Sequence, residues 1–253
     1  MEIYDTLIVG CGYGSVGYAL ANKNTVICEE HQICDTSFYL PMRTFHYTPY
    51  APKTKEGDDL QELFDSFSLF KEGVQNVNGF EYAFCKFISE KDLTILLKCR
   101  VIRMLQKTDG IYDVTVQTNG GLSHLLAKQV LNATDCTGPK QYTVLFVCNC
   151  IDPVREQLES CFEGARIEPT AYENRYALHF VVCADTDENR IKLDVYHKWQ
   201  SHAINAKILY MAPVFYGNGS GGELCDGRFD NPIEAFEAGY LYGKEQANVS
   251  IES

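Results

Sequence analysis

The sequence predicts an α/β fold: a parallel sheet with covering helices and a β-meander, interrupted by a small β-rich inserted domain. Three observations support this fold class. Residues 1–30 read as strand, glycine-rich turn, helix and second strand. Residues 91–138 contain successive short strands. The last predicted strand, 208–216, leads through a glycine-rich segment into a helix.

The N-terminal stretch matches the Rossmann-like βαβ unit that binds dinucleotides. The apolar run 4–9 is followed by Gly10 and Gly12, the first two glycines of the G-x-G-x-x-G pattern. Gly10 permits the tight turn, and Gly12 leaves room for a pyrophosphate to approach the backbone. Ser15 takes the third glycine position, where a small residue still allows close packing. The helix N-terminus offers N–H groups to phosphates. The loop residues expected at the cofactor are Gly10, Gly12, Tyr13, Gly14 and Ser15.

The second strand, 25–28, ends at an acidic pair, Glu29 and Glu30. Glu29 follows Gly10 by nineteen residues, close to the roughly twenty expected in this unit. Its carboxylate can accept hydrogen bonds from both ribose hydroxyls, and it disfavours a 2′-phosphate of the same charge. Both acids are predicted to lie at the nucleotide. The other interpretation is a glycine-rich turn in some different α/β protein.

Composition narrows the classes of function. The 253 residues are 45% hydrophobic, enough for one large domain or a domain with an insert. No apolar run approaches the roughly 20 residues that span a bilayer, and a strand begins almost at once, so no signal peptide is expected. The net charge of −12 disfavours nucleic acid and anionic membranes as partners. The eleven cysteines are expected to be reduced, buried thiols in a cytoplasmic protein.

The aromatic segment after Glu29 is expected to pass near the nucleotide. Arg43, His46 and Tyr47 are candidates for substrate contacts, although Arg43 and His46 are also consistent with ordinary surface residues. His31 and Cys34 resemble half of a metal site, but no second pair lies nearby, so no metal is predicted.

The middle of the chain alternates helices and strands. Residues 58–73 predict a helix that begins at Asp58 or Asp59, and residues 80–88 predict a strand. Further strands are expected at 93–105, 111–117 and 123–127.

Residues 141–204 are predicted to form the insert, and residues 1–140 and 205–253 a single discontinuous domain. Within the insert, an apolar strand precedes a helix that begins near Pro153, and strand 176–184 pairs with 191–199 as a hairpin. Cys148 and Cys150 could be redox-active, but strand cysteines in a cytoplasmic protein are usually inert.

The last helix carries a clear start signal. Asn231 is the expected cap, Pro232 the first helical residue, and Glu234 completes a capping box. Gly239 and Gly243, four residues apart, give this helix a smooth face for close packing.

At residues 127–134 the sequence resembles a known family. Ala-Lys-Gln-Val-Leu-Asn-Ala-Thr is similar to the "Ala-Lys-x-Val-Ile-x-Ala-Thr-Gly" signature of FAD-dependent oxidoreductases of the glutathione-reductase-like superfamily. It departs at Asp135, where that family usually has glycine. The glycine loop and the "Glu-Ala-x-x-x-Gly-x-x-x-Gly" helix at 234–243 extend the resemblance to rather more than a third of the chain.

The resemblance implies an FAD site built from several segments. The backbone of Val101 would lie near the adenine, and the stretch Ala133, Thr134 and Asp135 near the ribose and pyrophosphate. The family's acid at the ribityl chain corresponds by position to Asn218, with Asp226 as the other candidate. The N-terminus of the last helix, at Pro232 and Ile233, would face the flavin ring and favour its anionic reduced form.

We therefore expect an FAD-dependent oxidoreductase that transfers a hydride between bound flavin and a small organic substrate. One alternative is a non-catalytic FAD-binding subunit, or one whose site a partner chain completes, because the insert is small. The sequence is also compatible with a homo-oligomer. A nicotinamide-dependent dehydrogenase would share only the N-terminal unit, and no second glycine fingerprint follows the first. Covalent flavin attachment through Cys34 or His46 is a further alternative.

Overall fold

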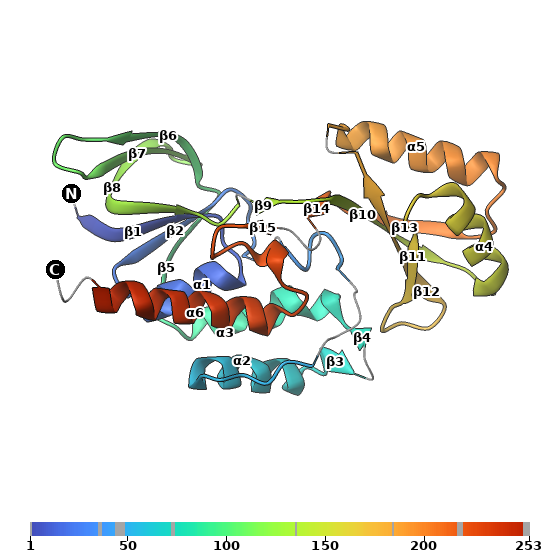
Figure 1. Ribbon diagram of the computed structural model, residues 1–253, viewed down its shortest axis with the longest axis horizontal. Helices are drawn as coiled ribbons and strands as arrows, with labels where there is room; N and C mark the ends of the chain where they lie inside the picture. Colours follow the sequence, from blue (N-terminus) through green and yellow to red (C-terminus); the bar gives the residue numbers. More distant parts are fainter. Residues whose placement is uncertain are drawn as a thin grey trace.

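The computed structural model describes residues 2–34, 37–43, 49–71, 74–134, 136–183, 185–216 and 220–249. These residues form two large sheets and two small, two-stranded ones. The large sheets and their helices lie side by side along the long axis of the molecule (Figure 1). We call one the parallel-sheet region (residues 3–132 and 226–249) and the other the antiparallel-sheet region (residues 140–216). The predicted α/β class is confirmed.

The larger sheet has six strands in the order β5-β2-β1-β8-β7-β6. The strands are β1 (Ile3–Val9), β2 (Thr25–Glu29), β5 (Thr94–Leu97), β6 (Arg100–Gln106), β7 (Tyr112–Thr118) and β8 (Gly121–Asn132). β1 lies between β2 and the second half of β8 and is parallel to both, while the first half of β8 pairs antiparallel with β7. One long strand therefore joins the parallel sheet to the predicted meander.

Helices α1 (Tyr13–Ala21) and α6 (Pro232–Val249) lie side by side against this sheet (Figure 1). Their backbones touch. A Cβ atom at Gly17 would lie 2.0 Å from the carbonyl oxygen of Phe236, and one at Gly239 would lie 2.0 Å from that of Gly14. The smooth face predicted from Gly239 and Gly243 is confirmed. The cap is also confirmed, because Asn231 Oδ1 accepts a hydrogen bond from the N–H of Ile233 at 2.8 Å.

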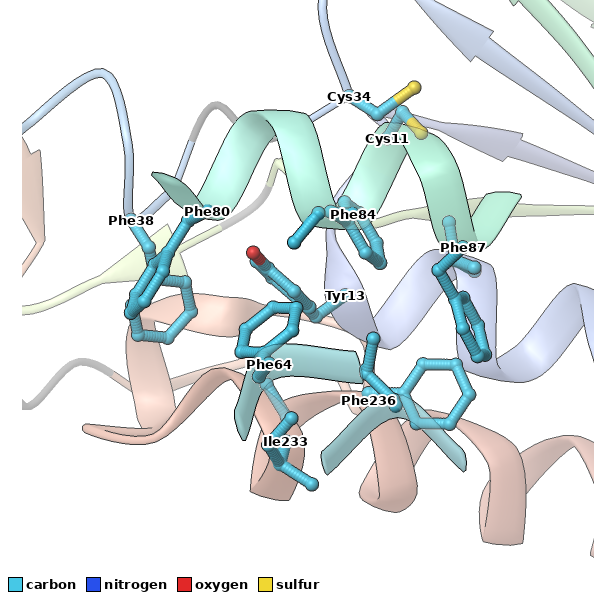
Figure 2. Packing of buried hydrophobic residues seen from close by; sticks show 14 of the residues in the cluster. Cys11, Tyr13, Cys34, Phe38, Phe64, Phe80, Phe84, Phe87, Ile233 and Phe236 are labelled. Atoms are coloured by element: carbon cyan, nitrogen blue, oxygen red, sulfur yellow. The ribbon is translucent and has the colours of Figure 1, made fainter. Parts of the chain in front are cut away.

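An aromatic core lies beneath these helices. Tyr13 stacks on Phe84 with ring centroids 3.9 Å apart and meets Phe64 edge-on. Figure 2 shows the side chains of α1, α2, α3 and α6 meeting there. The labelled members are Cys11, Tyr13, Cys34, Phe38, Phe64, Phe80, Phe84, Phe87, Ile233 and Phe236.

Two predictions for this core were wrong. α2 spans Lys55–Ser66 rather than 58–73, because the Thr54 hydroxyl accepts from the N–H of Gly57 and caps the helix earlier. Residues 80–88 form a helix, α3 (Phe80–Ser89), and not a strand. Short elements precede α3: β3 (Phe70–Lys71), β4 (Val74–Gln75) and the 3₁₀ helix η1 (Val77–Gly79).

The second sheet is antiparallel, in the order β11-β12-β10-β13, with β14 also paired to β10. Its elements are β10 (Lys140–Val147), α4 (Ile151–Cys161), β11 (Arg166–Pro169), β12 (Arg175–Val182), α5 (Glu188–Ser201), β13 (Lys207–Met211) and β14 (Phe215–Tyr216). The hairpin strand predicted at 191–199 is wrong, since these residues lie in α5. The predicted strand 208–216 is two strands. Both pair with β10, beyond the insert boundary predicted at residue 204.

A disulfide joins the segment after β8 to the segment before α6. Cys136, in β9 (Cys136–Thr137), bonds to Cys225, which precedes the 3₁₀ helix η2 (Asp226–Arg228). β9 also pairs with β15 (Ser220–Gly221). The prediction that all eleven cysteines are reduced is wrong for this pair. Within the described residues, no helix has the length and apolarity to cross a membrane, and no three acidic, His or Cys side chains form a metal site.

Candidate functional site

Gly10 makes the tight turn that the sequence predicts. Gly10 adopts φ +95°, a conformation that glycine accepts without strain. A Cβ atom there would lie 2.6 Å from Thr134 Cγ2, so the first glycine also lets the end of β8 pack on the loop. The buried Ser15 hydroxyl donates to the Gly10 carbonyl oxygen at 2.8 Å and closes the turn. Loop, α1 and β8 thus meet at one point.

Glu29 fixes the second side of the site. Its side chain is buried, and Oε2 accepts a hydrogen bond from the N–H of Cys11 at 2.7 Å. Oε1 accepts from the N–H of His31 at 2.8 Å and lies 2.7 Å from His31 Nδ1. The acid therefore ties the end of β2 to the glycine loop. Glu30 points elsewhere and lies 3.6 Å from the Arg100 guanidinium at the surface.

Asp226 is the second buried acid of the site. Its carboxylate oxygens accept hydrogen bonds from the N–H groups of Tyr13 at 2.8 Å and Gly14 at 2.9 Å, across 212 residues or more of sequence. A Cβ atom at Gly12 would lie 2.3 Å from Asp226 Oδ2, so only glycine allows this approach. An acid of the last third of the chain thus caps α1.

Arg43 is buried and holds the segment that carries Asp226. Its guanidinium donates to the carbonyl oxygen of Phe229 at 2.6 Å and to that of Asp226 at 3.4 Å. It also lies 4.4 Å from the centre of the Phe38 ring and 3.6 Å from the carboxylate of Asp230. With 1% of its surface exposed, Arg43 is not an ordinary surface residue. Its role toward a substrate stays a prediction.

A cavity lies beside the glycine loop, Arg43 and Asp226, and a second cavity adjoins it. The first, about 330 Å³, is lined by the glycine loop, Thr134, Arg43, Asp226 and the segment 213–216. The second, about 580 Å³, lies at the ends of β2 and β6. Both are lined by His31 and Leu40, so they adjoin. Together they form a hollow at the carboxyl ends of the parallel strands, where ligands bind in open α/β sheets.

The other predicted residues take different positions. Ala133 lines the first cavity and Glu30 the second, whereas Tyr13 and Ile233 belong to the aromatic core. Val101 lies in β6, next to Arg100 of the second cavity. Pro232 is the first residue of α6, as predicted. Asp135, His46, Tyr47 and Asn218 lie outside the described residues, so their predicted roles stay predictions.

The disulfide was missed by the sequence interpretation. Cys136 lines the first cavity and Cys225 is fully buried beside Asp226. The two cysteines are 89 residues apart, and no local spacing signals that they pair. Only the fold brings the end of β8 against the segment before α6.

No protein-family model matches this sequence, and no curated protein matches it significantly. Solved structures do match. p-Nitrophenol 4-monooxygenase from Pseudomonas putida is 12% identical, with 98% of this chain and 80% of that chain covered and a TM-score of 0.56. L-proline dehydrogenase from P. horikoshii is 10% identical, with 98% and 94% covered and a TM-score of 0.55.

A third match is aklavinone-11 hydroxylase, solved in a ternary complex with FAD and aklavinone. It is 12% identical, with 98% of this chain but 63% of the hydroxylase covered and a TM-score of 0.56. At these identities the likeness shows the fold alone. Almost all of this chain, the antiparallel-sheet region included, follows that fold.

Proposed function

We propose that this chain is an FAD-dependent oxidoreductase that transfers a hydride between bound flavin and a small organic substrate. The observation that carries the proposal is the hollow at the carboxyl ends of β1, β2 and β8, which the glycine loop lines and which Glu29 supports from within through its hydrogen bond to the Cys11 N–H. The likeness to a hydroxylase solved with FAD and to a dehydrogenase supports the same chemistry. Membership of the glutathione-reductase-like group is part of this proposal.

The residues present fit an FAD molecule at most positions. The glycine loop and Thr134 would hold the pyrophosphate, and the segment 213–216 would border the flavin end of the hollow. Glu29 lines neither cavity and both of its oxygens accept hydrogen bonds from backbone N–H groups, so it would support the glycine loop beside the adenosine ribose. The second cavity, with Arg100 at its wall, suits the adenine. The flavin supplies the redox chemistry when bound, and this chain orients it and excludes water. The phosphate position at α1, where Asp226 stands, does not fit an FAD molecule.

FAD is favoured over a nicotinamide nucleotide by the long strand β8. The second half of β8 pairs with β1 in the parallel sheet, and the first half pairs with β7 in the meander. A nicotinamide-dependent dehydrogenase needs only the N-terminal unit and does not require this connection. A site completed by a partner chain remains the second form of the proposal, in which the flavin end of the hollow would be closed by that partner.

An absorbance spectrum of the purified chain, before and after heat denaturation, tests the proposal directly. Flavin bands released into the supernatant support non-covalent FAD, and bands retained in the pellet indicate covalent attachment. If the chain is colourless, titration with FAD, FMN and NAD follows. Glu29→Gln should weaken FAD binding about tenfold, since a charged acceptor is lost, while Glu168→Gln, a buried acid in β11, should not. A chain that fails to bind FAD, whether or not it binds FMN or NAD, would contradict the proposal.

A further inference from the structure

The position of Asp226 has a consequence for any phosphate ligand. In dinucleotide-binding units the first N–H groups of the helix after the glycine loop point at the phosphates. Here the N–H groups of Tyr13 and Gly14 donate to the two carboxylate oxygens of Asp226. The carboxylate is 2% exposed. An anion that belongs to the chain itself therefore stands where the pyrophosphate of a dinucleotide is expected.

The space at this position does not admit both anions. The point where a Cβ atom of Gly12 would stand is 2.3 Å from Asp226 Oδ2, and the corresponding point at Gly14 is 3.0 Å from the carbonyl oxygen of Leu224. The segment 224–226 thus lies directly against the glycine loop. A phosphate could reach the N–H groups of Tyr13 and Gly14 only after this segment moves away.

Two attachments keep the segment in place. On one side of Asp226, the neighbouring Cys225 is joined by the disulfide to Cys136, with Cα atoms 5.9 Å apart. On the other side, the Arg43 guanidinium donates to the carbonyl oxygens of Asp226 and Phe229. The disulfide is covalent and fixes Cys225 to the end of β8. Arg43 holds its side through hydrogen bonds, which can break and re-form.

We propose that Asp226 is a resident anion that must leave the N-terminus of α1 before a dinucleotide pyrophosphate binds, and that the Cys136–Cys225 disulfide holds it there. The inference rests on the proposed function, whose site it regulates. A dithiol such as dithiothreitol would break the S–S bond and form two thiols, while the dithiol becomes a cyclic disulfide. Reduction would then favour dinucleotide binding, and oxidation would oppose it.

The test measures the affinity for FAD by quenching of flavin fluorescence, with the full chain oxidised or treated with dithiothreitol. The oxidised wild type should bind most weakly. Asp226→Ala should bind at least about tenfold more tightly, because a charged group bound by two N–H donors no longer competes. Cys225→Ser should match the reduced wild type and should not respond to dithiothreitol. Glu223→Gln, one residue before the segment and exposed, should leave the affinity unchanged.

Inorganic pyrophosphate separates this proposal from the proposed function. If Asp226→Ala gains pyrophosphate binding by calorimetry but neither protein binds FAD, the resident-anion proposal holds and the FAD proposal fails. If the wild type binds FAD with the same affinity in both redox states, and Asp226→Ala binds equally or more weakly, the resident-anion proposal is overturned while the FAD proposal stands. Fluorescence of Trp199 and circular dichroism confirm folding, and Cys225→Ser gives an independent answer should Asp226→Ala unfold.

Discussion

The parallel-sheet and antiparallel-sheet regions bury different kinds of side chain. In the parallel-sheet region three buried acids, Glu29, Asp226 and Glu237, each accept hydrogen bonds from backbone N–H groups of distant segments. Glu237, for example, receives the N–H groups of Lys53 and Thr54 at 2.6 Å each. In the antiparallel-sheet region the core is a cluster of apolar and aromatic side chains around Trp199. The first region fixes backbone positions with charges, and the second is filled by packing.

This difference has a functional meaning. Burying a charge costs solvation free energy, and hydrogen bonds from backbone N–H groups fix its position. Such a fixed arrangement suits a site that must receive a ligand of defined shape. A packed apolar core stabilises a scaffold and constrains its surface much less. Because the two clusters share no buried member, mutations in one region should be distinguishable from mutations in the other. Trp199, the one tryptophan of the chain, reports unfolding of the antiparallel-sheet region.

The largest expected effect is that of Gly239→Ala. Its new Cβ atom would lie 2.0 Å from the carbonyl oxygen of Gly14, a backbone atom that cannot rotate away, so α1 and α6 must separate. We expect a loss of about 3 kcal/mol or more in the free energy of unfolding. Denaturation followed by far-ultraviolet circular dichroism measures it, and Trp199 fluorescence shows whether the antiparallel-sheet region is affected.

Gly120→Ala is the matched control, since its nearest neighbour would be the Thr118 hydroxyl at 3.6 Å. If Gly239→Ala shifts the Trp199 transition as much as the circular dichroism transition, the two regions unfold as one unit. The contrast between the regions would then be one of composition only. An unchanged stability would show that the two helices do not pack as described.

The same contrast explains how much could be predicted from the sequence. The glycine loop, Glu29 and the Asn231 cap were predicted because each follows from a local pattern with a fixed physical reason. In α5, by contrast, residues 191–199 were predicted to form a hairpin strand, and Ile191, Leu193 and Val195 do alternate with polar residues. The structure buries Ile191, Val195 and Trp199, which are spaced four apart, and leaves Leu193 59% exposed. Tertiary packing, and not local pattern, selects the helix.

The residues of the candidate site also divide into those that a local pattern predicts and those that it does not. Asp226 was one of two candidates for a flavin contact, and nothing local indicated that it caps α1, because its partners Tyr13 and Gly14 lie more than 200 residues away. Residues 80–88 were predicted to form a strand, and aromatic residues, which are frequent there, do favour strands. Phe80, Phe84 and Phe87 instead share one helical face. Contacts between distant segments determine these features, and a single sequence does not display them.

A smaller effect, expected in the antiparallel-sheet region, depends on pH. His179 is buried in β12, where its Nδ1 lies 2.9 Å from the Thr143 hydroxyl. Burial, and then the nearby charges of Arg166 and Arg43, lower its pKa from 6.5 to about 3. Between these values the unfolded chain binds a proton that the folded chain does not, so stability falls as the pH falls below about 6.5. At pH 5 the loss is about 2 kcal/mol.

Urea denaturation followed by Trp199 fluorescence at pH 7 and pH 5 measures this loss. His179→Gln cannot take up the proton and should lose correspondingly less stability between the two pH values. His197→Gln, at an exposed position of α5, should behave like the wild type. A His179→Gln variant with an unchanged pH dependence would mean that this histidine is not the group that titrates. Burial of this histidine would then not distinguish the region from the other.

The smallest effect expected is the loss of a helix cap in the antiparallel-sheet region. Asp187 precedes α5, and its carboxylate accepts hydrogen bonds from the N–H groups of Asn189 at 2.9 Å and Arg190 at 3.3 Å. Asp187→Ala should lower the free energy of unfolding by about 1 kcal/mol, since one exposed cap is removed and no cavity forms. Asp185→Ala, two residues earlier and also exposed, should stay within about 0.5 kcal/mol of the wild type. A loss as large as that of Gly239→Ala would mean that charge bound to backbone N–H groups governs this region too, and the contrast with the parallel-sheet region would fail.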